Sequence, residues 1–168
     1  MPIVSFASLP DESRVWIFGS ARPLAGPTAE RLLSEVDRYL ASWNAHGAPL
    51  TCARDWRDEH FLIIGVDTTT EMASGCSVDG LFRTLQQVEQ SLEARLLGGG
   101  RIFYRDMDGR VQMTSRAELG ALVERGDVSA ETPVFDTSLT TAGDVRRRFE
   151  VPARATWVAA LMPAAKRS

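Results

Sequence analysis

Few residues of this 168-residue chain have side chains suited to nucleophilic or metal chemistry: it holds two cysteines and two histidines. They are Cys52, Cys76, His46 and His60. Their spacing matches neither a Cys-x-x-Cys redox motif nor a paired zinc motif. The sequence therefore predicts no metal and no organic cofactor. A redox pair of Cys52 with Cys76 is conceivable, but the spacing favours it less than a separate role for Cys76.

Cys76 lies in the segment ASGCSVD at residues 73–79, where a predicted helix begins with Ser77 as its cap. Unpaired N–H groups and the positive end of the helix dipole favour a thiolate at such a position. The N–H groups around Gly75 and Ser77 could also hold a small anion or an oxyanion. The alternative is a cysteine that packs as a small hydrophobic residue at a tight helix entry.

His46 lies 30 residues before Cys76 and is the candidate general base. A carboxylate to orient the imidazole would come from one of three acidic residues, Asp79 first, then Asp67 or Glu71. His46 could instead cap the last carbonyls of the preceding helix. His60 stands beside a predicted hairpin turn, and we expect it to be solvated.

Composition and charge exclude several classes of protein. The net charge of −3 argues against binding to a nucleic-acid backbone. No apolar run approaches the roughly 20 residues of a membrane helix, and Met1–Pro10 has no basic segment of the kind that opens a secretory signal. Lys166 is the single lysine, which rules out a Gly-Lys-Ser/Thr phosphate loop. We expect a cytoplasmic protein that binds neither nucleic acid nor membrane.

The order of predicted elements indicates an α+β fold. Hydrophobic patterning gives strand, helix, strand, strand, helix and strand at residues 14–18, 26–44, 50–56, 61–66, 77–92 and 101–105. This is the βαββαβ order of ferredoxin-like folds, which predicts an antiparallel sheet in the order 4-1-3-2 with both helices on one face. Residues 44–49 and 67–75 then meet at one edge of the sheet, which brings His46 toward Cys76.

The same patterning predicts an apolar second face on the sheet, because the strands at 14–18 and 61–66 are hydrophobic on both sides. Something must cover that face. The C-terminal third would do so, and a symmetric homodimer or another protein partner would serve equally well.

Three segments make up the predicted domain organisation: a ferredoxin-like core at 1–105, a small α+β appendage packed on it at 106–162, and a flexible tail at 163–168. In the appendage, Ser115 and Glu118 form a capping box for a short helix. The basic run at 146–148 is typical of a solvated surface and could meet an acidic partner.

Several motifs are spread over most of the chain: Ser13–Ile17, Arg22–Leu24, Trp43–Leu50, Ala73–Asp79, Val151–Ala153 and Trp157. Together they resemble a family of small bacterial proteins of uncharacterised function. Members are often labelled ABC transporter ATPases, but the residues of this chain do not support that activity. The resemblance implies no established function, and it points to His46, Cys76 and Asp79 without giving them a role.

A second set of residues lies in the C-terminal third: Tyr104–Val111, Ser115, Glu118, Leu119, Leu122, Gly126, Thr132 and Val134. This set is similar to the bacterial GYF-2 type of module, without the module's leading tryptophan. This resemblance implies contacts with peptides or proteins.

Three functions remain open. The first is a thiol-dependent enzyme for acyl transfer or hydrolysis, with Cys76 as nucleophile, His46 as base and Asp79 as orienting acid. The second is a noncatalytic binding or adaptor protein. The third is a sensor of a small anionic ligand at the same helix end.

Overall fold

The computed structural model describes residues 3–69 and 71–163, and the chain forms two compact units. The first unit contains the residues up to Leu97 together with Leu139–Arg147. The second unit contains Gly98–Ser138 and the residues from Arg148 on. The chain therefore passes between the units three times. Of the predicted tail at 163–168, Pro163 is described and the rest lies outside the described residues.

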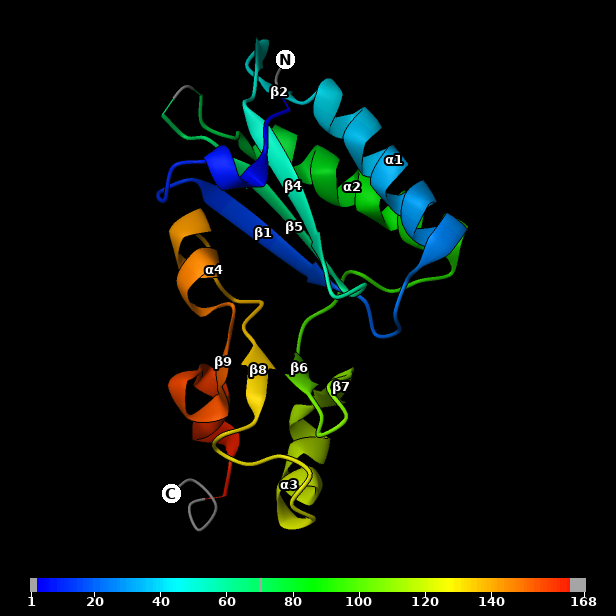
Figure 1. Cartoon of the computed structure of the whole chain (residues 1–168). Coiled ribbons are helices and arrows are strands. Elements are labelled where there is room, and N and C mark those ends of the chain that lie inside the picture. Colours follow the sequence, from blue (N-terminus) through cyan, green and yellow to red (C-terminus); the bar gives the residue numbers. More distant parts are fainter. Residues whose placement is uncertain (1–2, 70, 164–168) are drawn as a thin grey trace. The chain divides into compact units, whose positions relative to one another are not determined.

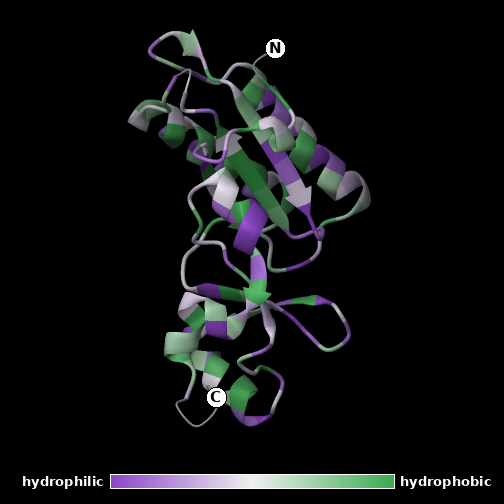
Figure 2. Ribbon diagram, turned by 60° about the vertical axis from the view of Figure 1, so that its left-hand side comes forward, coloured by the Kyte–Doolittle hydropathy of each residue, from purple (hydrophilic) through white to green (hydrophobic). Residues whose placement is uncertain are grey.

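The first unit is built on a three-stranded antiparallel sheet in the order β1-β5-β4 (Figure 1). Its strands are β1 (Arg14–Gly19), β4 (Cys52–Arg57) and β5 (Phe61–Val66). Every residue of β5 is buried, and Figure 2 shows this central strand as strongly hydrophobic. The order of these three strands is the one that the sequence predicts.

Two antiparallel helices cover one face of this sheet, α1 (Gly26–Ala41) and α2 (Gly75–Leu92) (Figure 1). Pro27 stands in the first turn of α1, where its missing N–H costs no helical hydrogen bond. The helices and the sheet share a core whose fully buried members include Leu32, Leu40, Leu62, Ile64, Leu81 and Leu85. Residues at helical spacing supply this core, as predicted.

The second face of the sheet is covered by two segments of the same chain. One is the N-terminal segment with the short helix η1 (Phe6–Ser8), and the other contains α4 (Ala142–Arg148). A Cβ at Gly65 would lie 2.6 Å from a methyl group of Leu9, which shows how closely the N-terminal segment approaches β5. Among the described residues, Val15, Phe61 and Ile63 on this face are therefore buried within the chain.

Arg146 connects these two covering segments, although all three arginines of the run at 146–148 are exposed, as predicted. Its guanidinium donates to Asp11 at 2.7 Å and to the carbonyls of Phe6 at 3.0 Å and Leu9 at 2.7 Å. Arg147 donates to the other Asp11 oxygen at 3.2 Å. A guanidinium has five N–H groups, so one side chain can satisfy several carbonyls that face away from any strand.

The second unit contains a four-stranded antiparallel sheet in the order β7-β6-β8-β9. Its elements are β6 (Arg101–Arg105), β7 (Val111–Ser115), α3 (Arg116–Glu124), β8 (Pro133–Phe135), β9 (Glu150–Pro152), η2 (Ala153–Ala155) and η3 (Trp157–Leu161). Buried residues of β6, α3 and η3 form its core. As predicted, the Ser115 hydroxyl caps α3 by accepting from the N–H of Glu118 at 3.3 Å.

The place of β6 differs from the prediction. We expected it as the fourth strand of the first sheet, beside β1, but it pairs with β7 on one side and β8 on the other. The α+β class holds, whereas the described residues do not form the four-stranded ferredoxin-like sheet. The division between the two compact units falls between Leu97 and Gly98, before β6.

No helix within residues 3–69 and 71–163 has both the length and the hydropathy that crossing a membrane requires.

Candidate functional site

The first turn of α2 presents Cys76 to solvent. Ser74 is the residue that caps this helix, because its hydroxyl accepts from the N–H of Ser77 at 3.1 Å. Ser77, the predicted cap, lies inside the helix and is buried, with its own hydroxyl donating to the Ser74 carbonyl at 2.8 Å. The predicted anion-binding N–H of Ser77 is therefore already used by the cap. The N–H groups of Gly75 and Cys76 have no acceptor among the described residues.

The two cysteines lie in opposite environments. Cys76 is exposed, whereas Cys52 is fully buried in β4 beside the Leu40 carbonyl, with its sulfur 3.7 Å from that oxygen. Burial raises the pKa of the Cys52 thiol to about 11. Thiolates are the reactive form, so Cys52 is inert near neutral pH and accessible thiol chemistry falls to Cys76.

His46 occupies the tip of a small hairpin formed by β2 (Asn44–Ala45) and β3 (Ala48–Pro49). His46 and Gly47 are its two loop residues, with φ of 53° and 80°. Two-residue hairpins favour positive φ at both positions, because that backbone twist matches the strands. The imidazole is exposed and does not cap α1, which ends at Ala41.

This hairpin is anchored to the first turn of α2 by two aromatic side chains at the end of α1. The indole Nε1 of Trp43 donates to the Ser77 carbonyl at 2.8 Å, and the Tyr39 hydroxyl donates to the same oxygen at 3.2 Å. Gly80 makes room for this approach, because a Cβ there would overlap the Tyr39 hydroxyl. Figure 1 shows β2 and the start of α2 at the same end of the sheet.

We call this end of the first unit the α2 rim, defined as the β2–β3 hairpin and the first turn of α2. It holds the three predicted catalytic residues, Cys76, His46 and Asp79, all with exposed side chains. No hydrogen bond joins any two of these side chains in the part of the chain that the structure describes. The fold brings the segments together, and the three side chains remain free to meet a ligand.

His60 has a structural role, which corrects the prediction that it is solvated. It is 5% exposed, and its Nδ1 lies 2.8 Å from the Ser20 carbonyl. The oxygen can only accept, so Nδ1 carries the proton. The N–H of Ser20 in turn donates to the His60 carbonyl at 2.7 Å. This pair fixes the exit of β1 against the β4–β5 turn.

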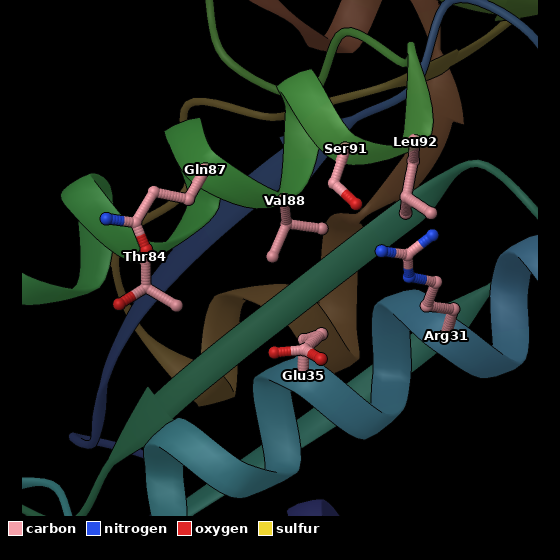
Figure 3. Close-up of a pocket in the computed structure, with 7 residues that line it drawn as sticks. All are labelled: Arg31, Glu35, Thr84, Gln87, Val88, Ser91 and Leu92. Atoms are coloured by element: carbon pink, nitrogen blue, oxygen red, sulfur yellow. The ribbon is translucent and has the colours of Figure 1, made fainter.

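A hollow of about 210 Å³ lies between α1 and α2 (Figure 3). We call it the α1–α2 groove. It is lined by residues of both helices: Arg31, Glu35, Thr84, Gln87, Val88, Ser91 and Leu92. Sequence patterning did not indicate it, because the outer residues of two separate amphipathic helices become neighbours only when the helices pack.

No group of three or more His, Cys, Asp or Glu side chains within residues 3–69 and 71–163 is arranged to hold a metal ion.

Comparison of the chain with protein-family models, with curated proteins and with solved structures finds no match. The family membership and the GYF-2-like segment inferred from sequence motifs therefore stay predictions.

Proposed function

We propose that the α2 rim is a thiol site for acyl transfer or hydrolysis. The observation that carries the proposal is the exposed Cys76 in the first turn of an 18-residue helix, beside the hairpin that bears His46. Trp43 holds these two segments together through the Ser77 carbonyl. An accessible cysteine at a helix N-terminus has the setting that nucleophilic thiols use.

In this proposal His46 takes the thiol proton and the sulfur of Cys76 attacks the carbonyl carbon of an acyl substrate. The carbon–sulfur bond forms, the leaving group departs with a proton from the imidazolium, and water or a second acceptor then releases the acyl group from the thioester. Asp79 orients the imidazolium. The N–H groups of Gly75 and Cys76 stabilise the negative charge on the carbonyl oxygen.

Alkylation by iodoacetamide tests the proposal within one protein, because Cys52 is a buried internal control. We expect peptide mass spectrometry to show Cys76 modified at pH 7 faster than a model thiol, while Cys52 stays unmodified until the protein unfolds. His46→Gln should slow the reaction of Cys76, and Pro49→Ala on the same hairpin should not. A Cys76 rate no higher than that of the model thiol would contradict the proposal.

A second candidate, binding without catalysis, is favoured by exposed methionines on the β6–β7 hairpin. Met107 is 93% exposed at the turn, and Met113 is 38% exposed on β7. Flexible methionine side chains adapt to varied apolar partners. The GYF-2-like segment overlaps this hairpin, and that resemblance implies peptide contacts.

Selection from a displayed peptide library tests this candidate. Peptides selected by the wild-type chain should lose affinity for a Met107→Gln, Met113→Gln double variant. Met72→Gln is the matched control, because Met72 is 67% exposed but belongs to the first unit. Equal binding by the wild type and the double variant would exclude the hairpin as the contact surface.

Two broader expectations accompany these candidates. Both cysteines are free thiols, which supports a reducing, cytoplasmic setting. The third candidate, a sensor, would bind a small anion at the N–H groups of Gly75 and Cys76 and would catalyse no reaction. Its binding site would also lie in the α2 rim. Binding would show as thermal stabilisation by an anionic metabolite that survives in Cys76→Ser.

A further inference from the structure

The α1–α2 groove holds two opposite charges that do not pair with each other. Arg31 and Glu35 stand one turn apart on α1, a spacing at which opposite charges commonly pair. Glu35 instead accepts from Arg38 at 3.2 Å, and Arg31 has no ion pair or hydrogen bond with any described residue. Figure 3 shows the Arg31 guanidinium near Leu92 and the Glu35 carboxylate below Val88.

Between the two charges, α2 supplies an apolar floor with polar groups around it. Val88 is buried and Leu92 is half-buried. Thr84, Gln87 and Ser91 add hydroxyl and amide groups along the edge of the α1–α2 groove. The volume of about 210 Å³ is below the roughly 300–1,000 Å³ of pockets for drug-sized ligands, so a fitting ligand is small.

The two charges select the type of ligand. A simple anion drawn to Arg31 would also meet the Glu35 carboxylate, and a simple cation drawn to Glu35 would meet Arg31. A molecule with a carboxylate at one end and an amine at the other satisfies both. A guanidinium binds a carboxylate through two parallel hydrogen bonds. Glu35 can still accept an ammonium group, because each carboxylate oxygen has more than one acceptor position.

We infer that the α1–α2 groove binds a small zwitterion of amino-acid or dipeptide size. Its carboxylate lies on Arg31, its ammonium on Glu35 and its apolar body on Val88 and Leu92. This site is separate from the proposed thiol chemistry, because the groove follows the later turns of α2 whereas Cys76 is in the first turn. Failure of either proposal leaves the other standing.

Nuclear magnetic resonance titration tests the inference with glycyl-leucine as the probe. We expect saturable shifts of amide signals at residues 31–35 and 84–92. Blocking either end of the probe, as N-acetyl-glycyl-leucine or glycyl-leucinamide, should weaken binding about two- to fivefold, since each removes one ion pair. Arg31→Gln and Glu35→Gln should each have the same effect.

Two variants serve as matched controls, because Arg83 on α2 and Glu30 on α1 are exposed charges outside the groove. Arg83→Gln and Glu30→Gln should leave the dissociation constant unchanged, and the dispersion of the amide spectrum verifies that every variant folds. The inference is overturned by an absence of saturable shifts in the groove. It is also overturned if the blocked probes bind as tightly as the free dipeptide, or if the control variants weaken binding as much as the groove variants do.

Discussion

The two faces of the first unit's sheet are held by different kinds of interaction. On one face, α1 and α2 bury periodic apolar side chains, and each helix is close in sequence to the strand it covers. On the other face, two segments about 135 residues apart meet through Arg146 and Asp11. The first face is stabilised mainly by burial, and the second adds directional hydrogen bonds that fix where irregular backbone lies. The comparison shows that a sheet face can also be covered by irregular segments whose apolar residues have no regular spacing in the sequence.

The largest effect is expected on the helix face. Leu85 is fully buried between α2 and the sheet, so Leu85→Ala should lower the free energy of unfolding by about 2–5 kcal/mol. Urea unfolding followed by circular dichroism measures the change. Gln86→Ala, exposed on the next position of α2, is the control and should change stability little. Equal stability of the two variants would contradict burial as the main source of stability on this face.

A smaller effect is expected where the N-terminal segment contacts β5. Gly65→Ala should cost about 1–3 kcal/mol, because the added methyl group collides with Leu9. Leu9→Ala should remove the collision, so the double variant should lose less stability than the sum of the two single variants. Strict additivity in urea unfolding would show that Leu9 does not lie over Gly65 in solution.

A third prediction concerns the hydrogen bonds that Arg146 makes on the second face of the sheet. Arg146→Ala should cost about 1–3 kcal/mol and should increase proteolysis of the N-terminal segment, because the carbonyls of Phe6 and Leu9 lose their charged donor. Arg147→Ala, whose side chain is 63% exposed, should have the smaller effect. The two variants can be compared by urea unfolding and by limited proteolysis with mass spectrometry. Equal losses of stability and equal proteolysis in the two variants would show that the hydrogen bonds of Arg146 have no special role in holding the N-terminal segment.

The smallest effect is expected from pH. Hydrogen bonds from Arg146 and Arg147 hold the pKa of Asp11 below its usual value of 3.8. A carboxyl whose pKa is lower in the folded state stabilises the protein above the unfolded pKa and loses that contribution as pH falls through the folded pKa. The wild type should therefore be more stable than Asp11→Asn at pH 6, and the two should converge as pH falls below about 3.8. A constant difference across that range would contradict the prediction.

The sequence predicted the helix face in detail and the other face only in outline, for physical reasons. The hydrophobic run of β5 and the apolar stripes of both helices follow from side-chain periodicity alone. The place of β6 does not, because its own residues suit either sheet, and it pairs both with β7, the next strand in the chain, and with β8, some thirty residues away. The role of Arg146 was not apparent, since nothing local marks an exposed guanidinium as the donor to carbonyls some 137–140 residues away.

The candidate site was predicted in part. The meeting of residues 44–49 with the start of α2 followed from topology, and the contact of Trp43 with Ser77 agrees with it. The atoms that make the contact were missed, because Trp43 falls at the end of the predicted helix 26–44 and nothing local shows that its indole N–H donates to Ser77. Ser74 and Ser77 are three positions apart and both suit a helix cap, so sequence could not choose between them. His60 was misplaced because a polar residue next to a turn gives no local sign of burial.

The division of the chain between the units has a consequence for synthesis on the ribosome. Residues 139–147 complete the first unit but follow most of the second unit in the chain. The N-terminal segment is available early, but the part of the second face that the segment with α4 covers stays exposed until residues 139–147 emerge, so a nascent chain stalled before residue 139 should be a target for chaperones. Expression of residues 1–105 alone should likewise yield an aggregating fragment, although that length contains all three strands and both helices of the sheet layer.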